Sequence, residues 1–284
     1  MAGGDKKNPD IRGMSYNSVR DELLLVDDNN KVVCAMRLRD NAGDLRDLYR
    51  APNDNSPFVW CVCHMSDSDA LLVCSSEDGP YQRRAKWLVA LSRSGNEWRE
   101  AQRVETEESG HISCALSDSR VLIGGDIFGT TYMELFRVES PLFRGKRIAR
   151  LHRIHVPEVY KWFSATCGSD TLVAMSYPKI IAIPNGDNSV RVHRLRGDRL
   201  EELAHIQLKR PDRLLRLADR LLVTDFDREK QSHALIELEV NDTRLERRRE
   251  LIATSENISR MCAVNDGLAI FDEKSKDILH YSFS

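Results

Sequence analysis

Acidic residues follow a recurring apolar strand at four places in the chain, and carboxylate oxygens are the ligands that a calcium ion prefers in proteins. The four acids are Asp27, Asp126, Asp225 and Asp272, with Asp28, Asp227 and Glu273 shortly after three of them. Together they can form a ring of oxygen ligands or a patch for a basic partner. Alternatively, each aspartate caps its own turn by accepting hydrogen bonds from nearby backbone amides. We favour turn capping, and metal ligation by these acids is the alternative hypothesis.

Two further clusters contain residue types that bind metals. His64 lies beside Cys61 and Cys63, and His152 lies three residues before His155. Neither set reaches four ligands at the spacing of a zinc site. The sequence also lacks the Gly-x-Ser-x-Gly elbow of hydrolases, a phosphate-binding loop and a dinucleotide fingerprint. We therefore predict no catalytic residue and no cofactor.

A repeat with a period near 50 residues positions these side chains. Its clearest copy, residues 111–139, contains three short apolar segments separated by residues that favour tight turns. Second strands, rich in Leu and β-branched residues, are predicted at 23–26, 71–73, 121–123, 172–174, 221–223 and 268–271. Third strands are predicted at 31–38, 86–92, 132–138, 190–195, 234–240 and 277–283. A more charged fourth strand usually follows.

A second series of aspartates lies in the turn between the first and second strands of the repeat. Its members are Asp67, Asp118, Asp170, Asp219 and Asp266. A catalytic site is asymmetric, whereas a structural turn needs the same residue type in repeat after repeat. We therefore interpret these five aspartates as determinants of the fold.

Six copies of about four strands each predict an all-β protein with a β-propeller fold. Small twisted sheets in radial repetition bury their faces only against their neighbours, which is why such repeats stack into a ring. Residues 11–284 are then expected to form one propeller domain, preceded by a flexible leader over residues 1–10.

Local motifs resemble several types of propeller. The run from Val26 to Asn30 resembles the NHL type, and the pair Gly124 and Gly125 after a strand resembles the kelch type. The Tyr and Trp that complete the kelch motif are missing. The sequence has no Trp-Asp dipeptide, so it resembles WD-repeat proteins only in the architecture of its repeat. The chain thus resembles the β-propeller repeat superfamily without matching one subfamily.

Composition restricts the class of partner and the compartment. The formal net charge of −2 argues against bulk attraction to nucleic acid, and we interpret the excess of Arg over Lys as Arg–Glu pairs across exposed outer strands. The seven cysteines lie mostly in predicted strands, so we expect buried thiols. There is no apolar signal segment and no long apolar run, so we expect a cytoplasmic protein, with the nucleus as an option, and no membrane partner.

These observations favour a non-enzymatic scaffold or protein-interaction module that binds a protein or peptide through a face built from loops. The resemblance to six-bladed propellers implies an alternative, a calcium-dependent hydrolase of the lactonase or esterase type that would use the acidic ring. A second alternative is binding of single-stranded RNA, as the NHL likeness implies. The balanced charge places nucleic acid last among these partners.

An apolar connection suggests where a protein partner binds. The segment from Tyr177 to Pro184 is apolar, although connections between strands are usually polar. We predict a binding patch on one face of the propeller, because exposed aromatic and aliphatic clusters mark interfaces. Its members are Phe128, Tyr160, Trp162, Tyr177, Ile180, Ile181 and Ile183. Alternatively, the isoleucines fold inward or extend the third strand.

The last repeat lacks a fourth strand in the sequence. It stops after the segment 277–283, which must lie next to the first repeat if six repeats close a ring. We expect residues near the N-terminus to help close the ring, and otherwise the last sheet ends in an exposed edge.

Overall fold

The computed structural model describes residues 9–38, 45–50, 58–65, 70–76, 86–95, 97–107, 112–117, 119–124, 132–139, 148–156, 165–167, 171–179, 186–217, 220–241, 244–254, 258, 260–265, 267–272 and 274–282. These residues contain 23 β-strands and no helix. No helix long and apolar enough to cross a membrane therefore occurs among them.

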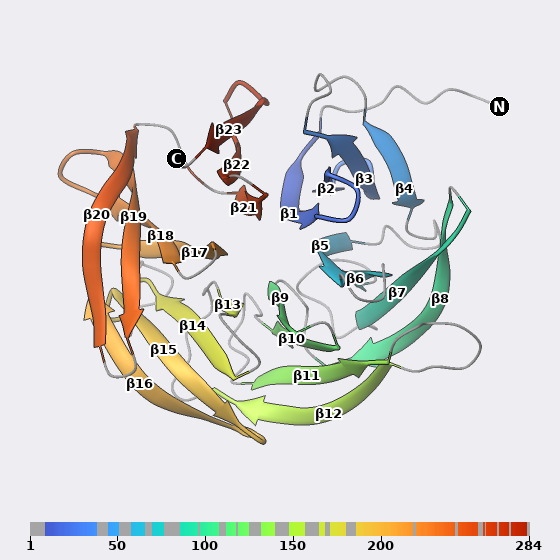
Figure 1. The fold of residues 1–284 in the computed structure, drawn as a ribbon, viewed down its shortest axis with the longest axis horizontal. Coiled ribbons are helices and arrows are strands. Elements are labelled where there is room, and N and C mark those ends of the chain that lie inside the picture. The colour runs from blue at the N-terminus through green and yellow to red at the C-terminus, as the bar shows by residue number, and fades with distance from the viewer. Residues whose placement is uncertain are drawn as a thin grey trace.

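The strands form six antiparallel sheets arranged as blades around a central axis, which confirms the predicted six-bladed propeller (Figure 1). The innermost strands, which contact one another around the ring, are β1 (Ile11–Asn17), β5 (Phe58–Met65), β9 (Ile112–Ser117), β13 (Ala165–Cys167), β17 (Pro211–Leu217) and β21 (Arg260–Val264). The second strands are β2 (Glu22–Asp27), β6 (Ala70–Ser76), β10 (Arg120–Gly124), β14 (Leu172–Tyr177), β18 (Arg220–Asp227) and β22 (Gly267–Phe271).

The third strands are β3 (Val32–Arg37), β7 (Lys86–Ser94), β11 (Tyr132–Val138), β15 (Ser189–Arg196), β19 (Ser232–Asn241) and β23 (Ile278–Ser282). Fourth strands complete the first five blades, namely β4 (Arg46–Arg50), β8 (Glu97–Thr106), β12 (Ile148–His155), β16 (Arg199–Gln207) and β20 (Arg244–Thr254). The second and third strands thus lie within a few residues of their predicted positions. Blade six has three strands among the described residues.

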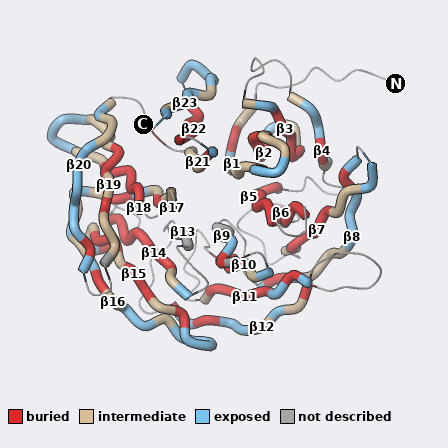
Figure 2. The backbone as a smooth tube through the Cα atoms, viewed as in Figure 1, coloured by how far each residue is buried: buried red, intermediate tan, exposed pale blue. Residues whose placement is uncertain are grey.

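The hydrophobic core lies between the blades. Six clusters of buried side chains are present, one for each pair of neighbouring blades. The second strands contribute most of the buried apolar side chains to this core, because both of their faces meet a neighbouring blade. Every residue of β2, for example, is buried. Figure 2 shows burial concentrated in the second and third strands of the blades and exposure along the outer strands, while innermost strands such as β1 and β17 are mostly intermediate. Burial on both faces explains why the second strands read as continuous apolar runs.

The fourth strands are twisted, and many of their exposed side chains are charged. Every pairing of a third with a fourth strand contains a shift in register, and such bulges increase the local twist of a strand. Arg–Glu pairs cross these outer strands, for example Arg249 with Glu237 at 2.9 Å and Arg248 with Glu239. The prediction that the arginine excess forms such pairs is confirmed for blade five. The exposed pairs contribute little stability each.

The ring closes between blade six and blade one through inner strands and apolar contacts. Strand β21 contacts β1, and the Arg260 guanidinium donates to the carbonyl of Ile11 at 3.1 Å. Ile278 of β23 packs against a cluster that includes residues of blade one, as the sequence predicted for the last strand. The leader at residues 1–8 lies outside the described residues, so its predicted role in closure stays a prediction.

Candidate functional site

The acids after the second strands cap five-residue turns. Asp27 accepts hydrogen bonds from the backbone amides of Asn29 and Asn30 at 3.1 and 3.3 Å, and Lys31 ends the turn with a positive φ of 56°. The turn beginning at Asp272 repeats this pattern, because the carboxylate accepts from the Lys274 amide at 2.9 Å. Both aspartates thus direct their oxygens at their own turn, as the capping hypothesis predicted.

Blade five divides between two aspartates the contacts that Asp27 makes alone in blade one. Asp227 caps the turn and accepts from the Glu229 and Lys230 amides at 3.0 and 3.2 Å. Asp225 accepts from the amides of Lys209 and Arg210, which lead into the blade, as Asp27 accepts from the Asp10 amide. Asp225 pairs with Pro211 as Asp27 pairs with Ile11, so Asp225 has the place of Asp27 beside the inner strand. Asp126 lies outside the described residues. No group of three or more His, Cys, Asp or Glu arranged to hold a metal ion occurs among the described residues.

Asp27→Ala is expected to lower the free energy of unfolding by about 1–2 kcal/mol, because several donors lose their acceptor in a buried turn. Besides the two turn amides, the Asp10 amide at 3.2 Å and the Asn30 side-chain amide at 2.5 Å donate to this carboxylate. Urea unfolding measures the change. Asp27→Asn keeps one acceptor oxygen and serves as the control, with a smaller loss. Equal stability of Asp27→Ala and the wild type would contradict the capping role.

The predicted aromatic and aliphatic patch is described only at Tyr177. This residue ends β14, and its side chain is 2% exposed in the cluster between blades three and four. Its hydroxyl donates to the Met175 sulfur at 3.4 Å. Tyr177 therefore packs in the core and is not part of an exposed patch, because the strand continues further than the sequence suggested. The other six members, Phe128, Tyr160, Trp162, Ile180, Ile181 and Ile183, lie outside the described residues or have no described side chain.

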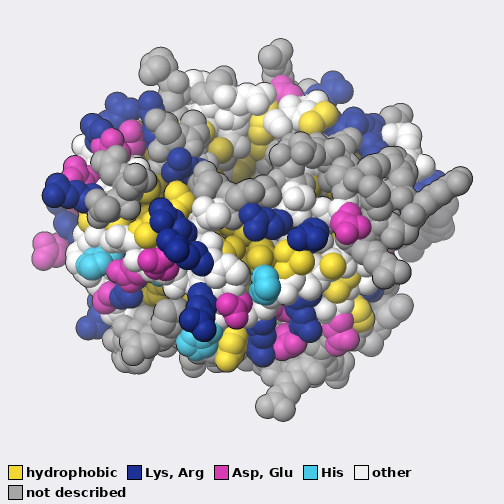
Figure 3. Space-filling model, turned by 60° about the horizontal axis from the view of Figure 1, so that its bottom comes forward, with side chains coloured by type: hydrophobic (Ala, Val, Ile, Leu, Met, Phe, Trp, Pro, Cys, Tyr) yellow, Lys and Arg dark blue, Asp and Glu magenta, His cyan; other side chains and the backbone are white. Residues whose placement is uncertain are grey.

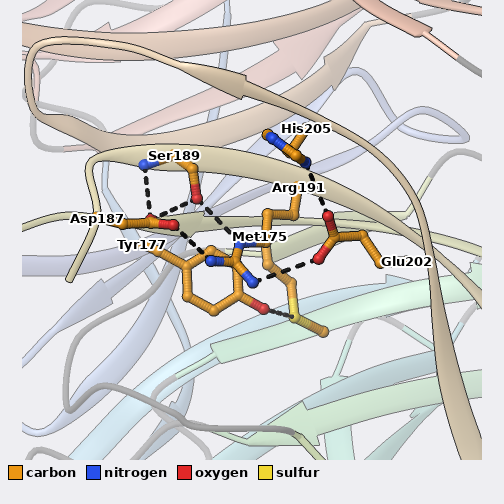
Figure 4. A network of polar contacts seen from close by, with 7 residues as sticks. All are labelled: Met175, Tyr177, Asp187, Ser189, Arg191, Glu202 and His205. Carbon is orange, nitrogen blue, oxygen red and sulfur yellow. Dashed lines mark hydrogen bonds and ion pairs between the residues drawn. The ribbon is translucent and has the colours of Figure 1, made fainter. Parts of the chain in front are cut away.

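A polar network covers Tyr177 on the outer side of blade four (Figure 4). Arg191 binds Asp187 at 2.5 Å and Glu202 at 3.3 Å, and its guanidinium carbon lies 4.6 Å from the centre of the Tyr177 ring. Burial by itself raises the pKa of Asp187, but hydrogen bonds from Ser189 and Arg191 outweigh it and hold that pKa below its usual value. Each charge in the network has a partner, so we interpret it as structural.

The cysteine cluster of blade two has the properties of packed thiols. Cys61, Cys63 and Cys74 are buried and form no disulfide, and Cys61 lies directly opposite Cys74 in the sheet. A hydrogen bond with Cys61 and burial raise the pKa of the Cys74 thiol well above its usual value. Burial alone raises the pKa of Cys262 to about 12. The Cys74 and Cys262 thiols therefore stay protonated at neutral pH. The prediction of buried thiols is confirmed for the five cysteines whose burial the structure describes.

Apolar residues of the described surface line a small groove between blades five and six, with a volume of about 50 Å³. Its lining consists of Ile252, Thr254, Ile258, Ile270, Asp272, Leu279 and Tyr281. Leu279 is 39% exposed and is one of two large apolar residues in the described part of the chain with such exposure. Apolar side chains exposed in a groove are a typical feature of a binding site.

The groove lies beside β23, the outermost described strand of blade six. Within the described residues, β23 pairs with β22 only, whereas each other third strand pairs on both sides. Among these residues, the cluster between blades five and six has five buried members, and partly buried apolar side chains such as Ile252 and Tyr281 pack against it.

Charge elsewhere on the surface is mixed. Figure 3 shows basic and acidic side chains interspersed over one side of the molecule, with no large area of a single sign among the described residues. A basic stripe of the kind that follows a nucleic-acid backbone is absent from that view.

Comparison with known proteins identifies the fold alone. No family model and no curated protein matches the chain. A soluble aldose sugar dehydrogenase from Escherichia coli superposes with a TM-score of 0.61 at 8% identity, covering 96% of this chain and 95% of that chain. The β-propeller domain of Cps50 (Swd1) from Myceliophteria thermophila gives 0.57 at 14% identity, covering 97% and 83%.

A Bacteroides thetaiotaomicron protein of unknown function gives a TM-score of 0.65 at 11% identity and covers 98% of this chain and 70% of that chain. These similarities agree with the β-propeller superfamily. Because a dehydrogenase and a propeller domain of another kind share the architecture, the fold does not assign an activity.

Sequence reasoning did not find the groove. Ile252 and Leu279 come from different blades and are separated by 26 residues in the chain. The run ILHYS in β23 carried a signal, because it places two bulky apolar residues in a strand that the repeat puts in the outer part of a blade.

Proposed function

We propose that this propeller is a non-enzymatic protein-interaction module that binds a protein or peptide in the groove between blades five and six. The observation that carries the proposal is the exposure of apolar side chains, Leu279 above all, in this groove. Such side chains supply apolar contact area to a partner.

A peptide-selection experiment tests this function directly. A random displayed peptide library is selected on the immobilised protein, in parallel with Leu279→Asp and with Val19→Asp. Val19 is 61% exposed in a turn of blade one, so Val19→Asp places the same charge at an exposed apolar position away from the groove. We expect sequences that are enriched on the wild type and Val19→Asp but not on Leu279→Asp. No enrichment, or equal enrichment on all three proteins, would exclude the groove as the binding site.

Calcium addition separates this function from the hydrolase alternative. A metal-dependent propeller gains stability when its metal binds the folded state, so its melting temperature rises with calcium until the site is saturated. Because the described aspartates already accept hydrogen bonds from their own turns, we expect no such rise. The measurement is thermal unfolding over a calcium titration, with magnesium as the control. A large, saturable and calcium-specific rise would favour the hydrolase.

A further inference from the structure

At the interface between blades two and three, one exposed carboxylate lies between two arginines. Glu107, directly after β8, binds Arg150 and Arg153 of β12 at 2.7 and 3.1 Å. We propose that these two arginines, the arginine pair, form a binding site for a carboxylate of an acidic segment of a partner protein, and that Glu107 occupies this site in the free protein. The inference goes beyond the proposed function, because it concerns a second surface and does not depend on the groove.

The first arginine of the pair is held in place by a buried carboxylate. Nη1 of Arg150 donates to Oε1 of Glu134 at 2.9 Å, and the Glu134 side chain is fully buried. The other oxygen of Glu134 accepts from the Glu107 amide at 3.0 Å, which ties the end of blade two to blade three. Nε and Nη2 of Arg150 have no acceptor among the described residues. The core therefore fixes this guanidinium without using all of its donors.

The second arginine is positioned by an aromatic ring. The guanidinium carbon of Arg153 lies 4.0 Å from the centre of the Tyr132 ring, and this ring packs edge-on against His155. Stacking of this kind uses the face of a guanidinium and not its N–H donors. Arg153 is thus oriented by one neighbour while it binds an anion with its edge. Both arginines of the pair are exposed over almost half of their side chains.

The spacing of the arginine pair already fits one carboxylate. Arg150 binds Oε1 of Glu107, and Arg153 binds Oε2, so each oxygen has its own guanidinium. The Glu107 side chain is 49% exposed, and exposed ion pairs of this kind contribute little stability, so another carboxylate can replace it. Glu237 of blade five also lies between two arginines, but its side chain is only 12% exposed. Glu107 is therefore the more easily displaced of the two.

Charge at this interface favours an acidic ligand. Lys86 donates to the carbonyl of Glu107 at 2.8 Å and adds a third cation beside the arginine pair. When Glu107 turns away, these three cations face one carboxylate, that of Glu134, so two positive charges are in excess among these side chains. Two guanidinium groups side by side match a planar group with two oxygens. An aspartate or glutamate side chain of a partner has this shape and charge.

The test measures binding of a fluorescein-labelled peptide with four glutamates between two glycines. A counterpart with four glutamines shows whether the carboxylates are needed, and fluorescence anisotropy gives the affinities. Glu107→Gln removes the internal carboxylate with little change in shape and should tighten binding of the glutamate peptide by about fivefold. Arg153→Gln should weaken it by about fivefold. Arg150 is kept in these variants, because its loss would leave the buried Glu134 without a partner.

Glu100→Gln is the matched control for the change in net charge. Glu100 forms two hydrogen bonds with Arg103 in the same blade, at 3.0 and 2.7 Å, and is also partly exposed. Its replacement removes the same charge but leaves the arginine pair occupied by Glu107, so binding should stay at the wild-type level. Equal tightening by Glu100→Gln and Glu107→Gln would show bulk attraction and overturn the proposal. The same holds if neither the wild type nor Glu107→Gln binds the glutamate peptide.

Two further variants test the role of Arg153. Arg249→Gln removes an exposed arginine of blade five that pairs with Glu237, and we expect no change in binding. Arg153→Lys keeps the charge but not the planar fork, so its affinity should lie between those of the wild type and Arg153→Gln. Weakening by Arg249→Gln as large as that by Arg153→Gln would contradict a site at the arginine pair.

A peptide with phosphoserine in place of the glutamates identifies the anion. Binding of this peptide that depends on Arg153, without binding of the glutamate peptide, would overturn the assignment to carboxylates. Leu279→Asp in the groove should leave binding of the glutamate peptide unchanged. The groove and the arginine pair are therefore tested independently, and the failure of one proposal is distinguishable from the failure of the other.

Discussion

Acidification from pH 6.5 to about pH 4 is expected to lower the free energy of unfolding by about 3 kcal/mol through one side chain, His193. This residue of β15 is 2% exposed, and burial lowers its pKa from 6.5 to about 4. The nearby Arg191 lowers it further, while Glu202 and a hydrogen bond with the Val173 backbone oppose the shift. The folded protein therefore holds the imidazole in its neutral form down to an acidic pH.

The direction of the effect follows from the two states of the histidine. Between about pH 6.5 and pH 4, His193 binds a proton in the unfolded chain but not in the folded protein. The unfolded state is thus favoured increasingly as the pH falls through this range. The contribution of His193 to stability is fully present above pH 6.5 and is lost once the pH falls below its folded pKa.

Denaturant unfolding of the wild type and His193→Gln at several pH values measures this contribution. Glutamine has a similar size, can still donate to a backbone carbonyl and does not titrate, so the variant should lose about 2–3 kcal/mol less than the wild type between pH 7 and pH 4.5. Titration of carboxylates is common to both proteins and cancels in the difference. His205→Gln, at an exposed position of the same blade, is the control. Parallel stability curves for wild type and His193→Gln would contradict the prediction.

Gly267→Ala is expected to destabilise the C-terminal strand by about 3 kcal/mol or more, because the added methyl group would meet backbone atoms. A Cβ at residue 267 would lie 1.9 Å from the carbonyl oxygen of Tyr281 and 2.9 Å from its carbonyl carbon. Backbone atoms of a paired strand cannot rotate away as a side chain can. The methyl group therefore fits only if β23 moves off β22.

The consequence reaches the binding groove, because Tyr281 and Leu279 form its wall on the β23 side. Gly267→Ala should lower the denaturation midpoint and speed hydrogen exchange at β23. The matched control is Gly197→Ala, where φ is +63° and no atom lies within 4 Å of an added Cβ. That variant should lose only about 1 kcal/mol through backbone strain. Equal stability of the two variants would show that residue 267 tolerates a side chain.

The sequence by itself determined the repeat and most of its strands. A strand that is buried on both faces needs an apolar run, and the run 221–223 is an example. A tight turn needs residues such as Asp or Gly within a few positions. Both signals can therefore be recognised in short segments of the sequence. The same local chemistry predicted turn capping by Asp27 and Asp272, and it predicted buried thiols at Cys61 and Cys63. Each of these features depends on residues within one strand or one turn.

Tertiary structure alone decided which residues lie together across the blades. The contacts that Asp27 makes alone are divided between Asp225 and Asp227 in blade five, because β18 continues two residues further before its turn. Tyr177 is buried because β14 extends to it and blade three packs against it. The groove exists because Ile252 and Leu279, from neighbouring blades, meet at a sheet without a described fourth strand. Contacts between blades form when surfaces that are distant in the chain pack together. The period of the sequence repeat does not predict which side chains make these contacts.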